Sequence, residues 1–168
     1  STKVGPMGKW CEVKCSCPDR VLVDSTQPID AVYRCGHKDG TLFQCWPGYI
    51  FRMGRILEAA LKDEPRRAQD FEILFRICNW RNYEDEYLSL ARDARDQWRL
   101  EIEELQAAQR GQNVLSRNAL QKWNSLWSDF FKDPWHREDA KSVDEILANC
   151  LRLCDASMRT ANPIEFYL

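Results

Sequence analysis

The sequence predicts an α+β fold, in which a small N-terminal antiparallel sheet packs on a C-terminal bundle of about five helices. Apolar residues alternate with polar ones in short runs before residue 46, which is typical of strands. After residue 47 they recur every three or four positions, which is typical of amphipathic helices. The period changes at Pro47-Gly48, so we divide the chain into residues 1–46 and 47–168 and expect one compact domain.

The strands are predicted from alternation and turn residues. Residues 9–17 place three cysteines and a valine in two-residue steps on one side, with Trp10 on the other. Residues 31–37 and 41–46 flank an Asp-Gly pair, which is a hairpin signal, and residues 21–23 suggest a further short strand.

Five helices are predicted in the second part of the chain. Ser116 precedes one of them as an N-cap, and Ser142 with Glu145 forms a capping box before another. Residues after 160 carry no periodic pattern, so we expect them to be irregular. The five predicted helices cover residues 49–61, 65–78, about 82–110, 117–132 and the segment that begins at residue 143.

The eight cysteines divide into two groups. Three lie on apolar faces of predicted helices, where burial in the core explains them. The N-terminal group contains Cys15-x-Cys17 and Cys35-x-His37, separated by 17 residues. Residues two apart on an extended segment point to the same side, so each pair can present both of its side chains together.

Three thiolates and one imidazole are a complete tetrahedral set for zinc. The segment around Cys35-Gly36-His37 resembles zinc-knuckle turns in general. Because four protein ligands leave no open position for water, the predicted zinc is structural, held by Cys15, Cys17, Cys35 and His37. The competing interpretation is simple burial of these cysteines in a small sheet.

Enzyme motifs are scarce in this sequence. It has two histidines and lacks the H-E-x-x-H, Walker, G-x-G-x-x-G and G-x-S-x-G patterns. Catalysis is therefore unsupported, and we favour a non-enzymatic protein. The alternative is a thiol- or metal-dependent enzyme that uses the N-terminal Cys/His cluster.

Tryptophan and charge patterns point to a protein partner. Seven tryptophans are many for 168 residues, and Trp10 and Trp46 lie on the strand face opposite the cysteines. Residues 83–110 carry eight acidic and four basic side chains, which suits a basic partner with Glu101, Glu103 and Glu104 as a charged rim. The alternative is that the protein's own helices cover the two tryptophans.

The leading hypothesis is therefore a protein-binding module, such as an immunity or antitoxin protein, an adaptor or a complex subunit. A nucleic-acid-binding subunit that uses the arginines of residues 52–81 ranks last, because the net charge is −2 and acidic residues intervene. No apolar run is long enough for a membrane span, and the N-terminus lacks a secretory pattern. We expect a cytoplasmic location, where the thiols stay reduced.

Overall fold

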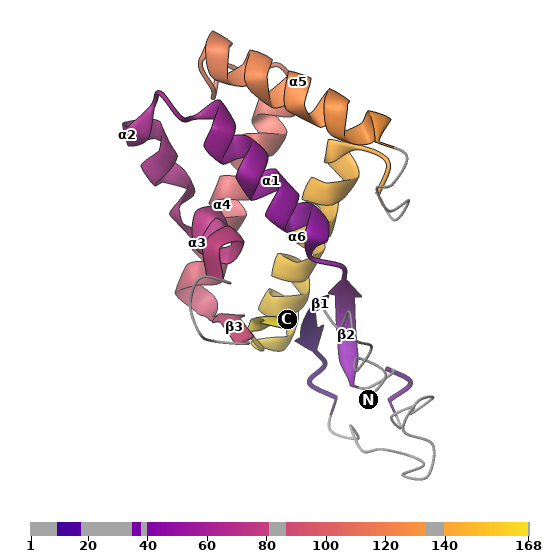
Figure 1. Ribbon diagram of the computed structural model, residues 1–168. Coiled ribbons are helices and arrows are strands. Elements are labelled where there is room, and N and C mark those ends of the chain that lie inside the picture. Colours follow the sequence, from indigo (N-terminus) through magenta and orange to yellow (C-terminus); the bar gives the residue numbers. More distant parts are fainter. Residues whose placement is uncertain (1–9, 18–34, 38–39, 81–86, 134–139, 168) are drawn as a thin grey trace.

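The computed structural model describes residues 10–17, 35–37, 40–80, 87–133 and 140–167. It confirms the α+β class, with a four-stranded antiparallel sheet at one end of a helical bundle (Figure 1). The strand expected at residues 21–23, and most of the one expected at 31–37, lie outside the described residues. The elements are β1 (Trp10–Lys14), β2 (Thr41–Cys45), α1 (Gly48–Ala60), α2 (Pro65–Ala68), the 3-10 turn η2 (Gln69–Phe71), α3 (Glu72–Asn79), β3 (Tyr87–Leu90), α4 (Arg92–Gln109), α5 (Arg117–Lys132), α6 (Val143–Thr160) and β4 (Ile164–Tyr167).

The strands lie in the order β2-β1-β4-β3, so two of the four come from beyond residue 46. The prediction that residues after 160 are irregular is wrong, because β4 is an inner strand that pairs with β1 and with β3. Ile164 and Phe166 are both fully buried. Four residues are too few for a clear alternating pattern, and only the two neighbouring strands make this segment extended.

The expected long helix at 82–110 also differs from the structure. Its described part begins with β3, and α4 starts only at Arg92. The segment Tyr-Leu-Ser-Leu is so short that it fits both the two-residue period of a strand and the 3.6-residue period of a helix. Pairing with β4 makes this segment a strand. Leu88 lies opposite Phe166 and Leu90 opposite Ile164, on the face that packs against the helices.

The other helices agree more closely with the sequence. The Ser116 hydroxyl accepts a hydrogen bond from the Ala119 N–H (3.1 Å), and that of Ser142 from the Glu145 N–H (3.2 Å), which confirms both N-caps. The helix expected over residues 65–78 is broken into α2, η2 and α3. Among the described residues, every helix is too short or too polar to cross a membrane.

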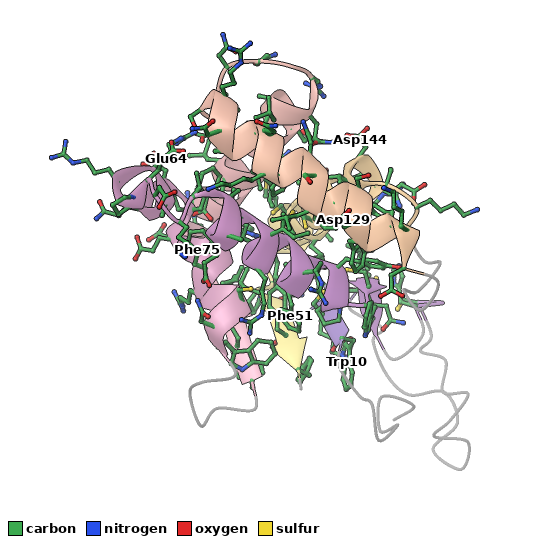
Figure 2. All side chains as sticks on the ribbon, turned by 45° about the horizontal axis from the view of Figure 1, so that its top comes forward. Trp10, Phe51, Glu64, Phe75, Asp129 and Asp144 are labelled. Atoms are coloured by element: carbon green, nitrogen blue, oxygen red, sulfur yellow. The ribbon has the colours of Figure 1, made fainter. Side chains whose placement is uncertain are left out.

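The sheet presents its two faces to different surroundings. Cys11 and Val13 of β1 are fully buried. They belong to the hydrophobic core, and α6 contacts β1 on this side. Trp10, Glu12 and Lys14 alternate with them and therefore lie on the opposite face. In Figure 2, Trp10 lies at the end of the molecule away from α5. We call this second surface the outer sheet face, formed by Trp10, Glu12, Lys14, Gln44, Tyr87, Ser89, Glu165 and Tyr167.

Candidate metal centre

The fold brings together the two Cys/His pairs that the sequence singled out. Cys15 follows β1 directly, and its backbone N–H donates to the Gly40 carbonyl (2.7 Å). Gly40 in turn donates to the His37 carbonyl (3.0 Å), which closes the turn before β2. Gly36, between the two predicted ligands of that turn, has φ +83°, a conformation that favours glycine.

Three of the distances among the four candidate donor atoms are close to those of a tetrahedral zinc shell. All four atoms lie within 4.8 Å of one another. The Sγ atoms of Cys15 and Cys35 are 3.8 Å apart, and His37 Nδ1 lies 3.5 Å from Cys17 Sγ and 3.3 Å from Cys35 Sγ. Tetrahedral zinc with Zn–S near 2.3 Å and Zn–N near 2.0–2.1 Å places two sulfurs about 3.8 Å apart and sulfur and nitrogen about 3.5 Å apart. The residues therefore fit zinc with His37 ligating through Nδ1.

The cluster also favours one thiolate before any cation binds. The backbone N–H of His37 stabilises the charged form of Cys35 and lowers its pKa from 9.0 to about 7, against the opposing effect of partial burial. Partial burial and the neighbouring thiols raise the pKa of Cys17 to about 11. Adding a second negative charge is thus unfavourable until a cation compensates it, which is the behaviour of a metal-binding thiol cluster.

Asn162, between α6 and β4, holds the first ligand pair in place. Its Nδ2 atom donates to the Lys14 carbonyl (2.9 Å) and to the Ser16 hydroxyl oxygen (3.0 Å). The Ser16 hydroxyl in turn donates to the Thr160 carbonyl (2.8 Å). Sequence reasoning missed Asn162, because nothing in the sequence links a residue near position 160 to one near position 15.

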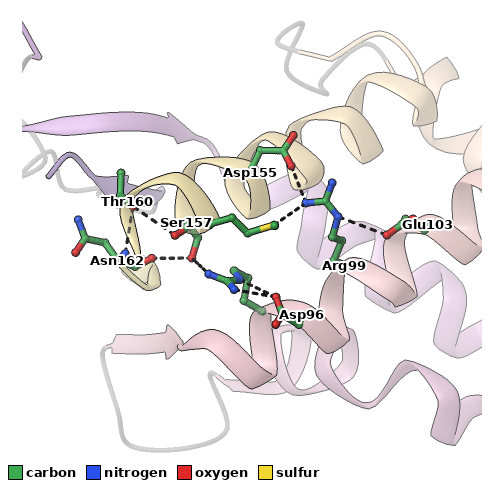
Figure 3. A network of polar contacts seen from close by, with 9 residues as sticks. Asp96, Arg99, Glu103, Asp155, Ser157, Thr160 and Asn162 are labelled. Carbon is green, nitrogen blue, oxygen red and sulfur yellow. Dashed lines mark hydrogen bonds and ion pairs between the residues drawn. The ribbon is translucent and has the colours of Figure 1, made fainter.

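Further hydrogen bonds connect Asn162 to the helical bundle (Figure 3). The Ser157 hydroxyl donates to the Asn162 carbonyl (2.6 Å) and accepts a hydrogen bond from Arg95 Nη1 of α4 (3.2 Å). The Asn162 N–H donates to the Thr160 hydroxyl (3.1 Å). The ligand-bearing segment after β1 is therefore anchored to α6 and, through Ser157, to α4.

Substituting Asn162 by alanine should weaken zinc binding about tenfold without removing a ligand. The variant loses the side-chain hydrogen bonds that orient the segment carrying Cys15 and Cys17, and partners of this supporting kind are typically worth about 10–100-fold in metal affinity. Competition with a chromogenic chelator measures the change, with the exposed Asn113→Ala as the control. Equal zinc affinities for the two variants would show that Asn162 does not position the site.

The predicted charged rim is corrected by the position of Glu101. This residue is 1% exposed, and its carboxylate accepts hydrogen bonds from the backbone N–H groups of Ile73 (3.1 Å) and Leu74 (2.8 Å) at the start of α3. Burial raises the pKa of Glu101, while these hydrogen bonds act in the opposite direction. Glu101 therefore caps α3 inside the protein and cannot meet a partner.

Glu103 and Glu104 remain on the surface but already have partners. Glu103 lies 3.5 Å from Arg99, and Glu104 lies 2.7 Å from Arg67. Arg67 also stacks over the Phe71 ring, with 5.2 Å to its centroid. These pairs tie α4 to its own turn and to α2, so each carboxylate is partly neutralised within the chain.

The two predicted tryptophan anchors differ in their surroundings. Trp46 is half-buried, contacts Tyr49 edge-on at 5.3 Å, and is covered by Gly48, where a Cβ would come within 2.2 Å of the indole. It packs on the protein's own α1, as the alternative interpretation expected. Trp10 lies on the outer sheet face and stacks on Tyr167, with ring centroids 4.8 Å apart.

Sequence reasoning missed most of the outer sheet face. Tyr167 lies between Trp10 and Tyr87 in register, so three aromatic rings from three strands form one row. The Tyr87 ring is 5.6 Å from that of Tyr167, and its side chain is 48% exposed. The alternation in residues 164–167 was the available signal, but the segment is only four residues long.

Comparison of the chain with protein-family models, with curated proteins and with solved structures finds no match, so the site's own geometry carries the functional argument.

Proposed function

We propose that this chain is a non-enzymatic protein-binding module whose sheet is held together by one structural zinc ion. The observation that carries the structural role is the cluster of Cys15, Cys17, Cys35 and His37, whose four donor atoms lie within 4.8 Å of one another. Four protein ligands leave no coordination position for a reacting water. Reduced cysteine ligands also suit a cytoplasmic location.

The outer sheet face is the proposed binding surface. Trp10, Tyr167 and Tyr87 offer a row of partly exposed aromatic rings, and aromatic residues are enriched at interface hot spots. The next row contains Glu12 and Glu165, which lie opposite each other in the β1–β4 register. The zinc-held segment continues β1, so loss of zinc would disturb this face as well.

Charge favours a basic partner for this surface. The Glu12 carboxylate is engaged by Lys14 (3.1 Å) and by the Thr41 hydroxyl (2.9 Å), and Glu165 accepts the Tyr167 hydroxyl proton in a hydrogen bond. Glu12 is fully buried, so Glu165, which is half-buried, is the carboxylate of this pair that a partner could reach beside the aromatic row. A lysine or arginine side chain from a partner would gain both cation–π and ionic attraction there.

The experiment is a tagged pull-down from a lysate, with and without nuclease, followed by titration of the retained protein. Tyr87→Ala should weaken that binding at least tenfold, because it removes the most exposed ring of the row. The matched control is Leu100→Ala, since Leu100 is 60% exposed on α4, away from the sheet. Equal losses in both variants, or retention that vanishes with nuclease, would contradict the proposal.

The enzyme alternative has one observation in its favour, the lowered pKa of Cys35. A thiol with a pKa of about 7 is about half ionised in neutral solution, and its thiolate can act as a nucleophile. Rapid alkylation of Cys35 in the zinc-loaded chain would favour that alternative. Protection of Cys35 by zinc would favour the structural role.

A further inference from the structure

Cys11 and Cys45 form a second cysteine pair, outside the Cys/His cluster. They lie directly opposite each other in the β1–β2 ladder. Their sulfur atoms are 3.3 Å apart, and the Cys11 thiol also lies 3.4 Å from the Cys45 carbonyl oxygen, to which it can donate. Directly opposite residues of an antiparallel pair have Cα atoms about 4.5–5.5 Å apart, which is within the range that a disulfide spans.

The two thiols differ in their access to solvent. Cys11 is fully buried, whereas Cys45 is half-buried on β2, which is the outermost strand of the sheet among the described residues. A reagent in solution therefore reaches Cys45 first. Cys11 already lies against that sulfur and can act as the resolving thiol with a small change of side-chain rotamer.

We propose that Cys11 and Cys45 are a site of reversible disulfide formation whose reactant is a low-molecular-weight disulfide such as oxidised glutathione. The Cys45 thiol gives up its proton and attacks the reagent, forming a mixed disulfide and releasing one reduced thiol, which takes the proton. The Cys11 thiol then attacks the Cys45 sulfur and releases the second reduced thiol, which takes the Cys11 proton. Two protein thiols are oxidised and one reagent disulfide is reduced.

The cross-link would fasten the two strands that carry the halves of the Cys/His cluster. Cys15 and Cys17 follow β1, and Cys35 and His37 precede β2. Neither Cys11 nor Cys45 belongs to that cluster, so the disulfide and the zinc ion hold the same two strands independently. Oxidation should raise the thermal midpoint by about 5 °C or more, because the bond joins residues 34 positions apart and closes that loop in the unfolded chain.

Trypsin separates the relevant cysteines, which makes the test direct. Cleavage after lysine and arginine leaves Cys11 in residues 10–14, Cys45 in residues 39–52, the two cluster pairs in residues 15–20 and 35–38, and Cys150 in residues 142–152. The zinc-loaded chain is treated with oxidised glutathione, alkylated, and digested without reduction. Mass spectrometry should find residues 10–14 linked to residues 39–52, and reduction should release them.

Two results would overturn the proposal. One is that Cys45 carries glutathione after the treatment while Cys11 is still a free thiol, so that all of Cys11 reacts with the alkylating reagent once the chain is unfolded. The other is a link from Cys45 to Cys150 instead of Cys11. A link between residues 15–20 and 35–38 would instead contradict zinc protection of the cluster, so failure of the zinc proposal is distinguishable from failure of this one.

A variant provides the second measurement. The Cys45→Ser variant should fold, because position 45 is only half-buried. Oxidised glutathione should no longer raise the thermal midpoint of this variant. Cys78→Ala is the control, because Cys78 contacts α1 and lies far along the chain from both strands. In this variant oxidised glutathione should still raise the thermal midpoint. An equal shift in Cys45→Ser and in the wild type would refute the assignment.

Discussion

The Cys17→Ser variant should contain no stoichiometric zinc, whereas the wild-type chain should contain one zinc ion. Removing one of four ligands leaves an incomplete shell, and we expect an affinity loss of at least about 100-fold, since even supporting residues are worth about 10–100-fold. Cys15→Ser should behave in the same way and should also disturb β1, because Cys15 is 2% exposed. Elemental analysis of protein purified without chelator measures the metal content.

Loss of zinc should also lower stability. A ligand present at about 1,000 times its dissociation constant stabilises the folded state by about 4 kcal/mol. For a chain of this length that corresponds to a fall in thermal midpoint of about 8–16 °C. A chelator should therefore lower the midpoint of the wild type and leave that of Cys17→Ser unchanged.

The matched control is Cys45→Ser, because Cys45 is half-buried like Cys17 but lies outside the cluster. It should retain one zinc ion and the response to the chelator. Wild-type protein that is free of metal, or a Cys45→Ser variant that loses zinc as Cys17→Ser does, would refute the predicted ligand set.

Substituting Glu101 by alanine should destabilise the protein by about 2–6 kcal/mol. The substitution leaves the buried N–H groups of Ile73 and Leu74 without their acceptor, and each unsatisfied donor costs about 1–3 kcal/mol. Glu101→Gln should cost less, because one carboxamide oxygen can still accept a hydrogen bond. Denaturant unfolding measures both changes.

Glu103→Ala is the control from the same helix. Its carboxylate is exposed and its ion pair with Arg99 is long, so we expect a change of about 0.5 kcal/mol or less. If Glu101→Ala lowered the free energy of unfolding as little as Glu103→Ala, Glu101 would not cap α3.

The pH dependence of the Glu101→Gln variant gives an independent test. Burial raises the folded-state pKa of Glu101 above its ordinary value of 4.5. Its contribution to stability is then fully present below the unfolded pKa and is lost as the pH rises through the folded pKa. The stability gap between the wild type and the glutamine variant should narrow as the pH rises above 4.5, and a widening gap would contradict the shift.

The candidate site illustrates what short motifs can and cannot predict. The residues Cys15, Cys17, Cys35 and His37 were identifiable because the chemistry of zinc requires few residue types at short spacing. Asn162 was not, because its role depends on a contact across almost the whole chain. The same limit applies to Glu101, which looks like one more surface acid on a helix rich in them and is buried only because α3 begins beside it.

Local sequence patterns predicted the α+β class, the helices α1, α5 and α6, the serine caps of α5 and α6, and the four residues of the candidate metal centre. Each of these depends on local signals, namely periodicity, capping and ligand spacing, which act over a few residues. The tertiary structure alone decided the strands β3 and β4, the burial of Glu101 and the aromatic row of Trp10, Tyr167 and Tyr87. Strand pairing and burial are interactions between distant segments, and their energy depends on neighbours that the local sequence does not specify.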